Sequence, residues 1–184
     1  MIYNDLSIIL PEIFLSLYAM FALIGAVYSS KDKIAQRVTW LTAVIFILLA
    51  FWMIFAEAKT EIAFDGMFIN DAFSRFSKIV ILFSGSVVLI MGQDYMSRRG
   101  FLRFEYPLII ALSVVGMMVM VSAGDLMALY MGLELQSLAL YVVAAFKRDS
   151  LRSTEAGLKY FVLGALSSGL LLYGSALTYG YSGT

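Results

Sequence analysis

One carboxylate, Glu134, lies inside a stretch of sequence that is otherwise uncharged and mostly apolar. The stretch reads YMGLELQSLALY and covers residues 130–141. A charged group without a partner is costly in apolar surroundings, and ionisable residues inside membrane helices usually hold or transfer protons or ions. Glu134 is therefore the first candidate for proton-transfer chemistry. A glutamate that is hydrogen-bonded only for packing or for the register of its helix remains the alternative.

A lysine, Lys159 in STEAGLKYFVLGALSSG, is the second candidate. It lies about one turn inside an apolar segment, where a lysine side chain bends back toward the nearer end of the helix. Snorkelling to the membrane edge, or an i,i+4 ion pair with Glu155, explains its position as well as a functional role does. Two further cations, Arg75 and Lys78, are interpreted as charges at the edge of another segment.

The composition indicates the environment in which these groups act. Of the 184 residues, 61% are hydrophobic and only 14% are charged, whereas a soluble domain has about 25% charged residues. The mean hydropathy is +0.88. We therefore predict an integral membrane protein. Cysteine and histidine are absent, which excludes disulfides, thiolate metal sites and histidine ligands within this chain.

Apolar segments long enough to cross a bilayer as helices, about 20 residues each, occur six times. They cover residues 6–28, 38–56, 72–92, 104–122, 126–146 and 154–179. The predicted fold class is an all-α polytopic membrane protein with about six transmembrane helices. Pro11 interrupts the first segment and suits the first turn of a helix, so the regular part of that helix is expected to begin there.

Basic residues alternate between the connecting loops. The first, third and fifth loops share nine of them: Lys31, Lys33, Arg37, Arg98, Arg99, Arg103, Lys147, Arg148 and Arg152. The second loop has one lysine and the fourth has none. Because positive charge is retained on the cytoplasmic side, the odd loops are predicted to be cytoplasmic. Both ends of the chain are then on the outer side.

The second loop, near residues 57–71, is long enough to form structure. Its AFDGMF run places Asp-Gly between apolar residues, which predicts a β-hairpin with a two-residue turn. Asn70 or Asp71 is expected to cap the helix that follows.

Helical spacing indicates which residues share a face in each of the last two segments. Tyr130, Ser137 and Tyr141 share the face of Glu134, so this more polar stripe is expected to point toward protein or a water-filled cavity. In the last segment, small residues at Gly157, Gly164 and Ser168 form a row, with Phe161 among them. Such rows allow membrane helices to pack closely.

The run LELQSLALYVVAAFKRDSLRSTEAGLKYFVLGALSSGLLLYGSALTYGYSGT, residues 133–184, resembles a known family. It is similar to subunit N of bacterial respiratory complex I, the proton-translocating NADH:quinone oxidoreductase. The S-x-EAGLKYF-x-LGA-x-SSG pattern distinguishes this family from the related L and M subunits. LPE at residues 10–12 and FINDAFSRFSK at residues 68–78 match it more loosely.

The resemblance implies an antiporter-like subunit of about fourteen helices, built around two inverted five-helix repeats. Glu134 matches the glutamate of helix five, and Lys159 matches the lysine of helix six in the family's proton path. Residues 1–103 then form three peripheral helices, and residues 104–184 begin the first repeat. Since the chain stops at Thr184, it is expected to be part of a longer or split subunit.

The resemblance also implies the setting of the chain. The expected location is the bacterial inner membrane, with the mitochondrial inner membrane as the alternative. Subunits M, K and J are the expected neighbours, together with the lipid bilayer and without nucleic acid. FMN, iron–sulfur clusters, NADH and quinone are expected in the whole complex, and no cofactor is expected in this chain. A subunit of a cation/proton antiporter or a membrane-bound hydrogenase, or a structural scaffold subunit, remains an alternative.

Overall fold

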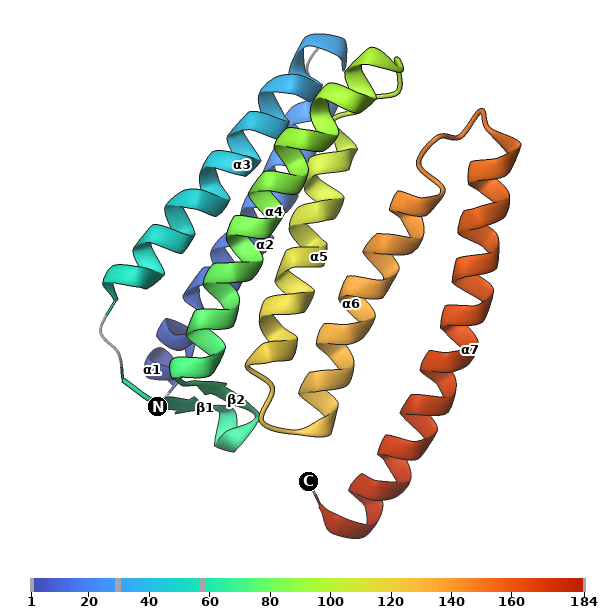
Figure 1. Cartoon of the computed structure of the whole chain (residues 1–184). Helices are drawn as coiled ribbons and strands as arrows, with labels where there is room; N and C mark the ends of the chain where they lie inside the picture. Colours follow the sequence, from blue (N-terminus) through green and yellow to red (C-terminus); the bar gives the residue numbers. More distant parts are fainter. Residues whose placement is uncertain (1, 29–30, 57–58, 184) are drawn as a thin grey trace.

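The structure is a computed structural model that describes residues 2–28, 31–56 and 59–183, with the side chains of residues 2–4 and 31–33 left out of the description. Most of the chain is helical (Figure 1). In chain order the elements are α1 (Ile2–Ile8), α2 (Leu10–Val27), α3 (Lys31–Phe55), β1 (Glu61–Ala63), the 3-10 turn η1 (Phe64–Gly66), β2 (Phe68–Asn70), α4 (Ala72–Arg98), α5 (Glu105–Val121), α6 (Leu126–Ala144) and α7 (Leu151–Ser182).

The helices confirm the all-α membrane fold class. Five described helices, α2, α3, α4, α6 and α7, are long and apolar enough to cross a membrane, and α5 is a shorter apolar helix of 17 residues. The first predicted span is divided into α1 and α2. Pro11 lies in the first turn of α2, where its missing N–H leaves no helical hydrogen bond unmade.

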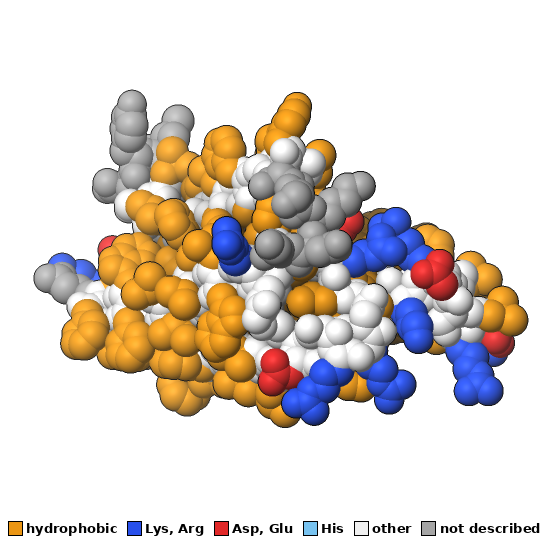
Figure 2. All heavy atoms as spheres, turned by 90° about the horizontal axis from the view of Figure 1, so that it is seen from above, with side chains coloured by type: hydrophobic (Ala, Val, Ile, Leu, Met, Phe, Trp, Pro, Cys, Tyr) orange, Lys and Arg blue, Asp and Glu red, His pale blue; other side chains and the backbone are white. Residues whose placement is uncertain are grey.

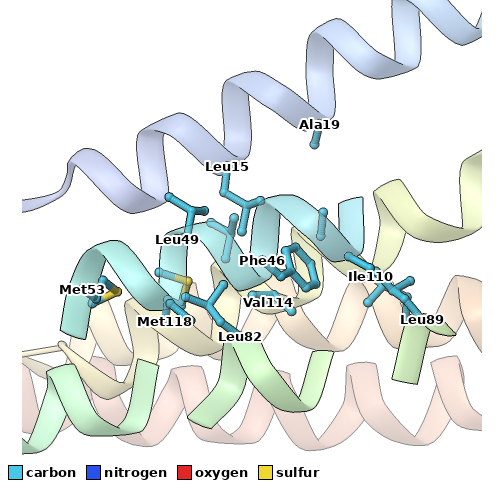
Figure 3. Close-up of a cluster of buried hydrophobic side chains, with 14 of the residues drawn as sticks. Leu15, Ala19, Phe46, Leu49, Met53, Leu82, Leu89, Ile110, Val114 and Met118 are labelled. Carbon is cyan, nitrogen blue, oxygen red and sulfur yellow. The ribbon is translucent and has the colours of Figure 1, made fainter. Parts of the chain in front are cut away.

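Helices α2 to α5 enclose an apolar core (Figure 3). Leu15 of α2, Phe46 of α3, Leu82 of α4 and Val114 of α5 are all fully buried within it. Gly85 lets α4 approach α3 closely, because an added Cβ would lie 2.9 Å from the Phe46 ring. The peripheral helices and α5 therefore share one core.

The connections gather at two opposite ends of the bundle. The β-hairpin and the α5–α6 connection lie at one end, here called the hairpin end, and the α4–α5 and α6–α7 connections lie at the other, the loop end (Figure 1). Figure 2 looks onto the loop end and shows Lys and Arg side chains around it. Seven of the nine basic residues predicted to be cytoplasmic are described and exposed there: Arg37, Arg98, Arg99, Arg103, Lys147, Arg148 and Arg152. The side chains of Lys31 and Lys33 lie outside the described residues.

The predicted hairpin is present, but the prediction that its turn has two residues is wrong. Strands β1 and β2 pair antiparallel, with Ala63 opposite Phe68, so four residues form the connection. Phe64 and Asp65 both have a φ of 54°, and Gly66 has a φ of 99°. The turn therefore extends over the η1 residues before the second strand begins.

Asp71, one of the two residues predicted for this role, caps the start of α4. Its Oδ1 accepts a hydrogen bond from the Ser74 N–H at 2.7 Å, and its own N–H donates to Ser74 Oγ at 2.9 Å. The Ser74 N–H holds the pKa of the Asp71 carboxyl below its usual value. The cap therefore stabilises the fold above the carboxyl's unfolded-state pKa, and this contribution is lost as the pH falls through the lower folded-state pKa.

The hairpin is also bonded to the connection between α5 and α6. The Ile69 N–H donates to the Ser122 carbonyl at 2.8 Å, and the Gly124 N–H donates to the Met67 carbonyl at 2.8 Å. A Cβ at position 124 would collide with the carbonyl of Gly66, so only glycine fits there. These bonds fix the turn immediately before Asp125, which caps α6 through the Ala128 N–H at 2.7 Å.

Candidate functional site

Helix α6 is held against α5 by two glycines. A Cβ on Gly116 of α5 would lie 2.6 Å from the Gln136 nitrogen, and a Cβ on Gly132 of α6 would lie 2.7 Å from the Met120 nitrogen. The two backbones therefore touch, which is the packing that small residues allow between membrane helices. This contact covers one face of α6.

Glu134 lies on the part of α6 that is turned toward α7. It is eight residues from Leu126 and ten from Ala144, so it is about 12 Å and about 15 Å from the two ends of the helix. Its side chain is half-buried. Ser168 of α7 donates a hydrogen bond from Oγ to Glu134 Oε1, and Tyr130 Oη lies 3.1 Å from the same Ser168 oxygen. Tyr130, Ser168 and Glu134 thus form a short hydrogen-bonded chain at mid-helix, with Glu134 at one end.

The predicted row of small residues forms the contact between α6 and α7. Gly157 lies against the Ala145 side chain, and Gly164 lies against the Tyr141 hydroxyl. The Tyr141 ring also packs edge-on against Tyr160, with 4.7 Å between ring centroids. The close approach brings Ser168, at the end of the row, within reach of Glu134.

Lys159 is not part of this cluster. Its Nζ lies 2.6 Å from Glu155 Oε1 in an i,i+4 pair, and the two side chains are 70% and 54% exposed. Nine residues of α7 separate Lys159 from Ser168, which amounts to about 13 Å along the helix. Among the described residues no ion pair joins Lys159 to Glu134.

Sequence reasoning missed a second pair of charges. Lys78 of α4 and Glu12 of α2 form an ion pair with 2.7 Å between Nζ and Oε1, and their side chains are 1% and 3% exposed. The interpretation of Lys78 as a charge at the membrane edge is wrong. Lys78 is the seventh residue of α4, and residues of α2, β2 and α3 surround its side chain.

The surroundings of this pair are unusually poor in hydrogen bonds. Glu12 Oε1 has the Lys78 ammonium as its partner, and Oε2 has no hydrogen-bond partner among the described residues. The Phe68 ring lies 4.6 Å from Lys78 Nζ on the hairpin side. Helical spacing was the available signal. Lys78 shares a face with buried Ser74 and Leu82, four residues to either side.

Comparison with known proteins identifies the chain. The family described as NADH:quinone oxidoreductase/Mrp antiporter, TM, matches residues 123–184. NADH-quinone oxidoreductase subunit N from Jannaschia sp. is 65% identical over 184 residues, which are 100% of this chain and 38% of that protein. Subunit N from Rhodobacter capsulatus is 60% identical over 180 residues, covering 98% of this chain and 37% of that protein.

The chain belongs to the subunit N family of NADH-quinone oxidoreductases. It spans the N-terminal 38% or so of the curated relatives that it matches. A chain of respiratory complex I from Thermus thermophilus with bound aureothin has the same fold, with a TM-score of 0.76 and 26% identity over 95% of this chain and 37% of that one.

The residues present in this subunit N chain do not fit a redox centre. Cysteine and histidine are absent from the sequence, and the described residues include no group of three or more acidic side chains that could hold a metal ion. Iron–sulfur clusters need thiolate or imidazole ligands.

Proposed function

We propose that this chain contributes to a proton-translocating membrane subunit of NADH:quinone oxidoreductase, with Glu134 as the group that holds the proton at mid-membrane. The observation that carries the proposal is the position of Glu134, a half-buried carboxylate at mid-helix bonded to Ser168. Oxidation of NADH and reduction of quinone, with FMN and the iron–sulfur clusters, are assigned to other subunits of the complex.

The hydroxyls beside Glu134 suit a group that changes its protonation. A hydroxyl can donate to a carboxylate, or accept from a carboxylic acid, by rotating its hydrogen. Ser168 can therefore form a hydrogen bond with Glu134 in its charged or its neutral form, and Tyr130 forms a hydrogen bond with Ser168. In general, a cation that arrives near a carboxylate favours its charged form, and a cation that leaves favours the neutral form.

We propose Lys159 as a second element of the path, on the resemblance of EAGLKYF to the family's helix six. Lys159 can leave Glu155 for another partner, because an exposed i,i+4 ion pair is weak. Water molecules between Lys159 and Glu134 would carry the proton across the gap between the two side chains.

We place the loop end of the bundle in the cytoplasm and the hairpin end outside, in the bacterial inner membrane. The seven exposed basic side chains at the loop end support this orientation, since basic residues near membrane helices stay on the cytoplasmic side. By family resemblance the neighbours are subunits M, K and J. Residues 1–103 then form the peripheral helices, and residues 104–184 form the start of the first repeat.

The test is Glu134→Gln in the whole complex. We expect the variant complex to assemble and oxidise NADH while losing most of its coupled proton pumping, because glutamine keeps the hydrogen bond to Ser168 but cannot hold a proton. Pumping is measured as acidification of inverted membrane vesicles per NADH oxidised. Assembly is followed on native gels.

A structural scaffold is the competing function, because Glu134 is tied to Ser168 by a hydrogen bond. A scaffold predicts that Glu134→Gln has no effect and that Glu134→Ala is harmful, since alanine leaves Ser168 without its acceptor. Normal pumping by an assembled Glu134→Gln complex would therefore reject the proton path and favour the scaffold.

A further inference from the structure

A cavity of about 230 Å³ reaches the buried Lys78 from the hairpin end of the bundle. Residues from four helices and the hairpin line it, among them Pro11 of α2, Met53 of α3, Asn70 of β2 and Lys78 of α4. Glu12 is not among the lining residues. Lys78, which does line the cavity, contacts Glu12 with 2.7 Å between Nζ and Oε1.

Two polar oxygens in this region are without partners among the described residues. They are Oε2 of Glu12 and Oδ1 of Asn70. Buried polar atoms are nearly always paired, either with protein or with ordered water. A water molecule occupies about 30 Å³ and needs two to four polar partners. The cavity therefore has room for several waters in contact with Lys78, and Asn70 in its lining offers them an acceptor.

The charges around Lys78 balance one another. Besides Glu12 of α2, it faces Arg75 and Asp71 at the start of its own helix, and the uncharged Phe68 ring of β2. The mouth of the cavity adds Lys59 and Glu61, and α3 contributes the uncharged Trp52 and Met53. Counted with Glu12 and Asp71, which do not line the cavity, the cations and anions around Lys78 number three each. The lining itself carries three cations, Lys59, Arg75 and Lys78, and one anion, Glu61.

We propose that Glu12 and Lys78 form a second ionisable site, separate from Glu134, that exchanges protons with the hairpin side through this cavity. Within the pair, a proton moves from the Lys78 ammonium to Glu12: an N–H bond breaks, an O–H bond forms, and two neutral groups remain. The free amine then takes a proton from a hydronium ion in the cavity and releases water. Loss of the Lys78 proton to cavity water re-forms hydronium, and transfer of the Glu12 proton back to the amine restores the ion pair, so the pair cycles between holding one proton and holding two.

The charge contact supports this cycle. A buried ion pair is costly because each ion loses its hydration, and attraction offsets that loss only where further hydrogen bonds satisfy the remaining lone pairs. Glu12 Oε2 has no such bond among the described residues. The unpaired oxygen makes the ion pair less favourable relative to its neutral form.

Met53→Cys tests the proposal in the assembled complex without touching the pair. Met53 lines the cavity and is 5% exposed, and the sequence contains no other cysteine. Thiosulfonates react with thiolates, which form where water reaches the sulfur. The control is Ser86→Cys, an almost isosteric change on α4 at a side chain that is 2% exposed and does not line the cavity.

We expect an aminoethyl thiosulfonate to label Met53→Cys and to leave Ser86→Cys unlabelled. The cationic adduct beside Lys78 should then lower the protons pumped per NADH, while a neutral propyl adduct of the same length should not. The proposal is overturned if Met53→Cys stays unlabelled, or if the two adducts have equal effects. Neither result bears on Glu134, whose role is tested by its own variant.

Discussion

Helices α2–α5 and helices α6–α7 each carry an acidic and a basic residue within apolar segments, and they enclose these residues to very different degrees. In the first group, Glu12 and Lys78 form a pair that is 3% and 1% exposed. In the second group, Lys159 is 70% exposed and Glu134 is half-buried. The described part of the chain encloses the first pair completely and leaves the second helix pair largely open.

The difference shows that depth along a helix does not decide the environment of a charge. Lys78 is the seventh residue of α4 and Lys159 is the ninth of α7, so they are at similar depths. Lys78 faces a core built from three other elements, whereas Lys159 lies on a helix that packs mainly against α6 within the described part of the chain. What a side chain faces determines whether its charge meets water or protein.

The largest effect that tests this comparison is expected from Lys78→Met. Removing one partner of a buried ion pair costs about 3–5 kcal/mol, because the other charge is left unpaired. We expect a lower thermal midpoint and less assembled complex on native gels. The control is the double variant Glu12→Gln with Lys78→Met, which leaves no charge behind and should recover much of the loss. An unchanged midpoint for Lys78→Met would contradict the burial described for the pair.

A smaller effect is expected where α6 meets α5. Gly116→Ala places a Cβ against the backbone of α6 at 2.6 Å from the Gln136 nitrogen, so the helices must separate. Overpacking of this kind costs about 1–3 kcal/mol. The loss is measured as a lower thermal midpoint. Gly25→Ala is the matched control, because a Cβ there meets nothing within 4 Å. Equal midpoints for the two variants would show that α5 and α6 are not in backbone contact.

The smallest effect on stability is expected at the exposed pair of α7. Lys159→Met and Glu155→Gln both break the same contact, which is worth about 0.5 kcal/mol or less, so neither should change assembly. They differ in what remains, because Glu155→Gln keeps the Lys159 amine. If Lys159 belongs to the proton path, only Lys159→Met should lower proton pumping per NADH. Equal pumping by both variants would remove Lys159 from the path.

Much of the fold could be predicted from the sequence because membrane helices obey a simple length rule. Six apolar segments predicted six helical regions, and Pro11 and Asp71 marked two helix starts correctly. The hairpin was predicted from Asp-Gly, but its turn was not, because the η1 residues adopt positive φ angles that the dipeptide signal does not specify. Turn geometry here depends on the contact with Gly124, which lies far along the chain.

The candidate site was only partly predictable. Glu134 was found because it is a charge in an apolar run, and the small residues of α7 indicated its packing partner. The Glu12–Lys78 pair was missed because each residue lies near a helix end, where charges are common. Only the packing of α2 against the start of α4, which involves residues 66 positions apart, brings the two charges together.

The bonds between the hairpin and the α5–α6 turn have a mechanical consequence. The start of α6 is held by the backbone hydrogen bonds that Ser122 and Gly124, just before it, form with the hairpin. Near its middle, the helix is held by the close packing of Gly132 against α5. The contact with α5 continues past Glu134, because Gly116 lies against the Gln136 nitrogen. Helix α6 is thus held against α5 on both sides of the carboxylate, so a change in the distance between Glu134 and Ser168 has to come from movement of α7.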